Sequence, residues 1–257
     1  MTYFSYGSRQ RLSFDSYHPD TAGPSACLLE LHHTLYDRFR AQSWDLYPYW
    51  EANRLISCVS AAGGAASDVS ALIYLRSEEQ ARTVEENMGL ESRSRGYSGI
   101  SASRHPVIEV RSTPDHFAVE LIISPDAWWD QQNVVGKLEL DRHRAGLRGL
   151  LRGLRPDYCF GFWGGERLND MHLTARQLVQ GAVLSEWLGT FADSQDYLRF
   201  GVWYAPDDPA LDPRRIASEV YSRLADLYSL YSFLVWTSNN NYRSFYEKRS
   251  YSQRRYA

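Results

Sequence analysis

One spacing of apolar residues occurs twice in this 257-residue chain, and it constrains the fold more than any other feature. The two sets are Leu151, Leu154, Tyr158, Phe160 and Trp163, then Leu224, Leu227, Tyr231, Phe233 and Trp236. Each set follows an alternating apolar run that ends in Pro-Asp, at Pro125-Asp126 and again at Pro206-Asp207. Alternation indicates a strand, and proline followed by an acid is typical of a helix start. The repeated spacing therefore predicts a duplicated strand-helix-strand unit.

Strand and helix patterns also alternate along the rest of the chain. Apolar residues recur at helical spacing over 28–41, and Ser77 opens a capping-box helix that ends near Gly89. A second capping pattern, at Thr174 and Gln177, predicts one helix that reaches about Phe191. Two alternating runs within 107–123 form a hairpin pattern. Together these elements predict an α+β protein with a mixed or antiparallel sheet and helices packed on it.

Changes in composition divide the chain into five segments. We expect a polar N-terminal arm over 1–24, an α/β segment over 25–89, a loop or linker rich in Ser, Gly and Arg over 90–104, the duplicated core over 105–236, and a basic aromatic tail over 237–257. The segment 25–89 and the core form either one domain or two.

Composition narrows the classes of protein to which the chain can belong. The formal net charge is −3, no apolar run approaches the length of a membrane span, and the first residues have no apolar leader pattern. The three cysteines show neither C-x-x-C spacing nor a disulfide framework. P-loop, G-x-G-x-x-G, G-x-S-x-G and H-E-x-x-H patterns are absent from the sequence, so no catalytic motif, cofactor or metal is predicted. We expect a cytoplasmic protein that does not bind membranes.

The segment that follows the first Pro-Asp combines two indoles with an acid and several amides. We select Trp128, Trp129, Gln131 and Asn133 as candidate binding residues, because rings and amides together can hold a base or another planar ligand. The alternative is an ordinary helix start whose tryptophans pack in the core.

Carboxylates near the same place support a second interpretation. Glu120, Asp126 and Asp130 lie near Lys137 in sequence, and this residue set could hold Mg²⁺ and activate water in a hydrolase or nuclease. The alternative is helix capping by the Pro-Asp pairs.

Two groups of basic residues could contact an anionic partner. Arg144, Arg148 and Arg152 recur every four residues and form one stripe on a helix. The last part of the chain mixes amides, rings and arginines, and its candidate binding residues are Asn240, Tyr242, Arg243, Arg254 and Arg255. The alternatives are a solvated helix face and a tail that docks on its own domain.

The sequence leaves three hypotheses for function. The first is a non-enzymatic binding protein that contacts nucleic acid or an acidic protein partner through the aromatic-amide segment, the arginine stripe and the basic tail. The second is the metal-dependent hydrolase or nuclease. The third is a structural subunit of a larger complex.

Overall fold

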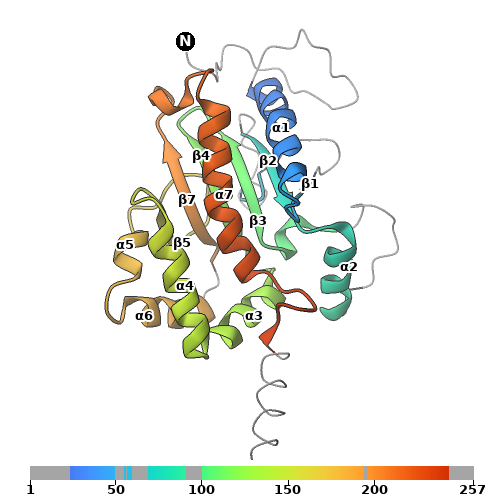
Figure 1. The fold of residues 1–257 in the computed structure, drawn as a ribbon, viewed down its shortest axis with the longest axis vertical. Coiled ribbons are helices and arrows are strands. Elements are labelled where there is room, and N and C mark those ends of the chain that lie inside the picture. The colour runs from blue at the N-terminus through green and yellow to red at the C-terminus, as the bar shows by residue number, and fades with distance from the viewer. Residues whose placement is uncertain are drawn as a thin grey trace, which may run out of the picture.

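The computed structural model describes residues 24–49, 55, 57–59, 69–90, 100–193 and 196–242. The helices are α1 (Pro24–Ala41), α2 (Glu78–Asn87), α3 (Trp128–Leu138), α4 (Asp141–Gly153), α5 (Ala175–Leu178), α6 (Val183–Asp193) and α7 (Ile216–Leu234) (Figure 1). The strands are β1 (Tyr47–Tyr49), β2 (Ser70–Leu75), β3 (Val107–Ser112), β4 (Phe117–Ile123), β5 (Cys159–Phe162), β6 (Leu173–Thr174) and β7 (Leu198–Tyr204). Short 3-10 turns span Ala102–Arg104 and Pro209–Leu211.

These strands form one sheet in the order β1-β2-β3-β4-β7-β5-β6. Every neighbouring pair is antiparallel, so the predicted α+β class with an antiparallel sheet is confirmed. Strand β7 comes late in the chain but lies between β4 and β5, which places distant segments side by side. Among the helices in the described ranges, none is long and apolar enough to cross a membrane.

The duplicated strand-helix-strand unit is not found. In the first copy Tyr158 lies just before strand β5, whereas in the second copy Tyr231 lies inside helix α7. Pro156 explains the difference, because proline cannot continue a helix and the chain leaves α4 before it. The second copy has no proline there, so its leucines and tyrosine continue along a single helix to Leu234. The prediction of a repeat was therefore wrong beyond the first strand and helix of each copy.

The predicted segments meet in the sheet. Strand β2 precedes the predicted loop over 90–104 and β3 follows it, yet the two strands pair directly. Within that loop, 91–99 lie outside the described residues, as do 1–23 of the predicted arm and 243–257 of the predicted tail. The candidate residues Arg243, Arg254 and Arg255 therefore lie outside the described part of the chain.

Helix boundaries follow local chemistry. The predicted Ser77 cap is confirmed, since its side chain accepts a hydrogen bond from the backbone N–H of Gln80. The capping box of Thr174 and Gln177 is also present, but the predicted helix to Phe191 is two helices. Gly181, between them, has a φ of +48°, a left-handed value that interrupts the helix.

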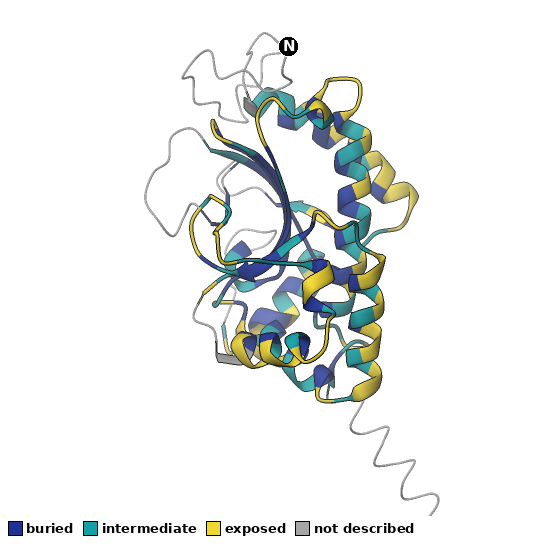
Figure 2. Cartoon of the chain, turned by 90° about the vertical axis from the view of Figure 1, so that its left-hand side faces the viewer, coloured by how far each residue is buried: buried dark blue, intermediate teal, exposed yellow. Residues whose placement is uncertain are grey.

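The two faces of the sheet are covered differently. Figure 2 shows helices along one side of the curved sheet. We call this side the helix-covered face; its apolar core includes Tyr74, Val110, Leu121 and Phe200. We call the other side the polar face; its central strands carry Glu109, Arg111, Glu120 and Arg199, all fully buried.

Candidate functional site

Helix α3, which contains the predicted aromatic-amide segment, turns one polar side toward the protein interior. Asp130, Asn133 and Lys137 recur at helical spacing, and all three are buried. Asp130 Oδ1 lies 2.6 Å from Arg76 Nη2 and accepts a 2.6 Å hydrogen bond from the backbone N–H of Trp236. Asp130 therefore connects the end of strand β2 to the chain that leaves α7.

Asn133 and Lys137 hold the next residues of that same chain. Asn133 Nδ2 donates to the carbonyls of Leu234 and Asn240, both at 3.3 Å, and its Oδ1 accepts from the N–H of Tyr242 at 3.0 Å. Lys137 Nζ donates to Asn240 Oδ1 at 2.8 Å, and burial lowers the pKa of Lys137 to about 8. The predicted binding residues Asn133, Asn240 and Tyr242 thus bind one another.

The remaining residues of the segment lie closer to the surface. Trp128 is 38% exposed, and Trp129 is half-buried with its ring 6.0 Å from that of Trp236. Gln131 Nε2 donates to the carbonyl of Ser124 at 3.0 Å, which ties the helix start to the end of β4. Trp128 is therefore the member of this segment that is most available to a partner.

The predicted carboxylates have different surroundings. Glu120 lies on the polar face between Arg111 and Arg199, Asp130 binds Arg76, and Asp126 is exposed in the turn before α3. Within the ranges that the structure describes, no group of three His, Cys, Asp or Glu side chains could hold a metal ion. Lys137 lies near Asp130 on α3, and it hydrogen-bonds to Asn240.

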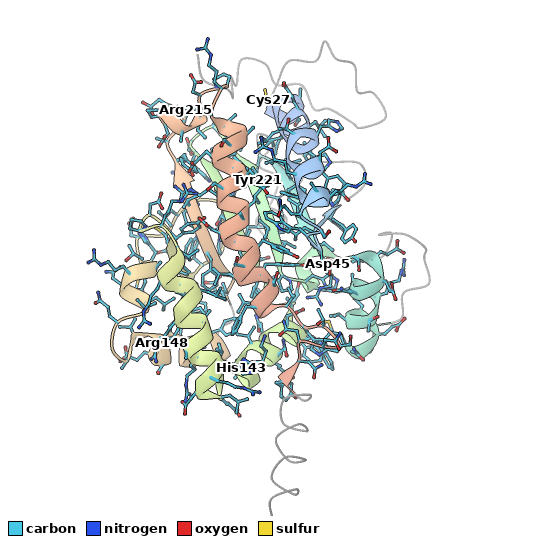
Figure 3. The ribbon with its side chains drawn as sticks, in the orientation of Figure 1. Cys27, Asp45, His143, Arg148, Arg215 and Tyr221 are labelled. Carbon is cyan, nitrogen blue, oxygen red and sulfur yellow. The ribbon has the colours of Figure 1, made fainter. Side chains whose placement is uncertain are left out.

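The arginine stripe lies on α4, at the front of the molecule (Figure 3). Arg144 pairs with Asp141 one turn before it on the same helix. Arg155, just beyond the helix, pairs with Glu219 and with Asp226 of α7. Arg148 is half-buried and Arg152 is exposed; neither has an acidic partner among the residues that the structure describes.

The polar face contains charged residues that the sequence analysis did not select. The strand register aligns Glu109 with Glu120 and then with Gly201, across β3, β4 and β7. The next row on the same face aligns Arg111, Ala118 and Trp203. The sequence signal that could have identified these residues is a charged residue at the centre of an otherwise apolar strand. Its partners could not be found without the strand order.

Glu120 is at the centre of this network. Arg199 donates to both of its oxygens, from Nε at 2.8 Å and from Nη2 at 2.7 Å, and Arg111 Nη2 also donates to it. Burial alone would raise the pKa of Glu120, but Arg111 and Arg199 hold it below its usual value. Gly201 leaves room for this carboxylate, since a Cβ there would lie 2.7 Å from Glu120 Cγ. Glu120 is therefore ionised and fully engaged, which makes it a poor general base.

Glu109 binds a different part of the chain. Its Oε1 accepts from Arg111 Nη1 at 2.8 Å and from the Ser57 hydroxyl at 2.6 Å, and its Oε2 accepts from the N–H of Cys58 at 2.9 Å. Burial first, and then Glu109, raises the pKa of the Cys58 thiol well above its ordinary value. A thiol with a raised pKa is mostly protonated at neutral pH, so Cys58 is a poor nucleophile.

Both arginines also hold the loop that follows β5. Arg199 Nη1 donates to the carbonyl of Gly165, and Arg111 Nη2 donates to that of Glu166 at 2.9 Å. The Arg199 guanidinium lies 5.0 Å from the ring centre of Trp163 and 5.9 Å from that of Trp203. The network thus fixes two indole rings and a loop on the polar face.

Comparisons with known proteins do not identify a family for this chain. No protein-family model matches the chain, and a search of curated proteins finds no significant match.

Proposed function

We propose that the protein is a non-enzymatic binding protein that contacts nucleic acid through helix α4. The observation that carries the proposal is the pair Arg148 and Arg152, one turn apart, which have no acidic partner in the described residues. Guanidinium groups on an exposed helix can neutralise phosphates, and each such contact releases counterions. Arg144 of the same arginine stripe can also contact phosphate when it leaves its exposed ion pair with Asp141, because such surface pairs contribute little to stability.

The state of the buried carboxylates also favours binding over hydrolysis. A hydrolase needs a free base or an open metal ligand, whereas Glu120 and Asp130 are each bound to arginine in the interior. Exposed Trp128 offers a ring for stacking on a base, the mode by which many proteins hold single strands. Arginines of the tail supply further phosphate contacts in this proposal.

Fluorescence anisotropy with labelled single-stranded oligonucleotides, over a series of salt concentrations, tests the proposal. The double variant R148A/R152A should reduce the slope of log affinity against log salt by about 1.4 units, or about 0.7 for each lost phosphate contact. The matched control is R214A/R215A, because both arginines are exposed near the start of α7 and Arg215 lies at the opposite end of the molecule from Arg148 (Figure 3). The control should keep the wild-type slope.

A second variant isolates the tail. A chain that ends at Tyr242 keeps the bonds that Asn133 makes to Asn240 and Tyr242, so it removes 243–257 without opening the turn after α7. This truncation should weaken binding while the melting temperature stays unchanged.

Three results would overturn the proposal. The first is no binding of oligonucleotide by the full chain at low salt. The second is an equal loss of slope in R148A/R152A and R214A/R215A, which would mean that α4 is not the contact. Binding of polyglutamate in place of oligonucleotide would also reject nucleic acid, and would assign the arginine stripe to an acidic protein partner.

A further inference from the structure

Four buried nitrogen atoms on the polar face have no hydrogen-bond partner among the residues that the structure describes. They are Arg111 Nε, His116 Nε2, Trp163 Nε1 and Trp203 Nε1. An unpaired buried donor costs about 1–3 kcal/mol, and groups of them are rare in folded proteins. Three of them, on Arg111 and the two indoles, can only donate, and such a group calls for an acceptor.

These four residues surround the same network. Arg111 and Arg199 meet at Glu120, and the Arg199 guanidinium lies against both Trp163 and Trp203. The two indole centroids are 5.7 Å apart. The strand register aligns Arg111, Ala118 and Trp203 across β3, β4 and β7, so only the methyl group of Ala118 lies between the other two side chains. Arg111 on β3 and Trp203 on β7 therefore lie on either side of this small side chain, which belongs to the strand between them, β4.

His116 belongs to this group through the turn that joins β3 to β4. The hydroxyl oxygen of Thr113 accepts from the N–H groups of Asp115 and His116, at 3.2 and 3.0 Å, and it lies 3.0 Å from His116 Nδ1. The same hydroxyl also donates to the carbonyl oxygen of His116 at 3.0 Å, so its single proton is shared between that carbonyl and Nδ1. In the tautomer that carries the ring proton on Nε2, Nε2 is a donor.

The charges of the face balance one another and so do not repel an anion. The carboxylates Glu109 and Glu120 only balance the charges of Arg111 and Arg199, so no excess negative charge opposes a ligand. Burial first, and then Arg111, lowers the pKa of His116 to about 4, as expected near positive charge. His116 and Trp203 are also partly exposed, so this end of the network is reached by solvent.

We infer that the polar face binds a compact oxyanion, a phosphate or a carboxylate group, through the unpaired donors of Arg111, His116, Trp163 and Trp203. The site is separate from the arginines of α4 and does not depend on the nucleic-acid proposal. Glu109 and Glu120 act as positioning residues, because they hold the guanidinium of Arg111 by its Nη atoms and leave Nε free.

Indole N–H resonances in ¹H–¹⁵N spectra report directly on two of these donors. Titration with inorganic phosphate, and separately with acetate, at constant ionic strength set by chloride, should shift the Trp163 and Trp203 signals. W163F and W203F assign the two signals. The Trp187 signal is the internal control, because its Nε1 is also buried without a partner but its ring packs against Phe191 and Phe200 in the core of the helix-covered face. The chemical shift of the Trp187 signal should not change in either titration.

The two titrations also separate the sources of the oxyanion. Saturation by phosphate alone assigns a phosphate group, and saturation by acetate alone assigns a carboxylate. W203F should bind about five-fold more weakly, the cost of one lost hydrogen bond, and W187F should bind like the wild type. His116→Asn removes a second donor without touching the ion pairs, so it keeps the test valid if W203F fails to fold. Unmoved Trp163 and Trp203 signals with both anions, or equal shifts with chloride, would overturn the inference.

Discussion

Strand β4 presents opposite chemistry to the two sides of the sheet. Toward the helices it turns Phe117, Val119 and Leu121, which pack in the apolar core. Toward the polar face it turns Ala118 and Glu120, and the carboxylate meets two buried arginines. Burial of apolar groups is the main source of stability, so the large apolar core of the helix-covered face contributes most to the fold, with a smaller apolar cluster around Ile122 on the polar face.

Apolar burial does not explain the buried charged residues of the polar face. Buried ion pairs gain little over apolar residues of the same size, because desolvation offsets the attraction between the charges. Here the pairs fix the side chains of Arg111 and Arg199 and leave donors such as Arg111 Nε unpaired. We interpret the face as a preorganised binding site whose charges are costly to disturb. The following predictions test this difference between the faces.

The largest effect is expected from Glu120→Ala. The substitution leaves Arg111 and Arg199 buried without their shared carboxylate, and loss of one partner from a buried pair typically costs about 3–5 kcal/mol. Urea denaturation measures the free energy of unfolding. The control Glu186→Ala, on the exposed surface of α6, should change it by less than about 0.5 kcal/mol. A cost for Glu120→Ala as small as that of the control would mean that the network is not held as described.

Gly201→Ala should have the next largest effect. A Cβ at this position would lie 2.5 Å from the carbonyl oxygen of Val119 and 2.7 Å from Glu120 Cγ, so β4 or the carboxylate must move. Overpacking of this kind costs about 1–3 kcal/mol. The same denaturation experiment checks it, and an unchanged midpoint would show that Glu120 does not lie over Gly201.

Acid should weaken the fold through His116. The pKa of His116 is lowered to about 4 in the folded chain, against 6.5 ordinarily, by burial and by Arg111 and Arg199, while Glu120 and Asp115 oppose the shift. Between pH 6.5 and 4 the unfolded chain binds a proton that the folded chain does not, so stability falls as the pH falls. Because the ring is partly exposed, we expect about 1–2 kcal/mol.

His116→Asn is the variant that isolates this titration from the other groups. Its free energy of unfolding should fall less between pH 7 and pH 4.5 than that of the wild type. An identical pH dependence in the two proteins would contradict the placement of His116 beside the arginines.

The smallest effect, of opposite sign, is expected at Gly149. This residue lies inside α4, and a Cβ there would meet nothing within 4 Å. Gly149→Ala should stabilise the protein by about 0.5–1 kcal/mol, because alanine loses less entropy in a helix. Thermal denaturation checks the sign, and destabilisation would show that α4 packs more closely than described.

Sequence patterns were sufficient where the chemistry is local. The Ser77 cap, the helix that carries the arginine stripe and the α+β class all follow from local sequence patterns. The predicted repeat failed because the spacing of Leu224, Leu227 and Tyr231 fits a helix face as well as a helix followed by a strand. Only Pro156 separates the two outcomes.

The candidate site was less predictable for a different reason. A side-chain amide such as that of Asn133 can hydrogen-bond to the backbone of its own chain as readily as to a ligand. Here it binds the turn after α7. The network around Glu120 depends on β7 lying between β4 and β5, a neighbour relation that no local pattern in the sequence contains. Arg199 could therefore not be assigned to Glu120 in advance.

The most direct test of the polar-face account is a crystal structure after a soak in selenate, an oxyanion that anomalous scattering can locate. The account predicts an anomalous peak at the polar face, with selenate oxygens about 3 Å from Arg111 Nε and His116 Nε2. Peaks confined to other surfaces, such as the arginines of α4, with no selenate beside Arg111, would contradict it.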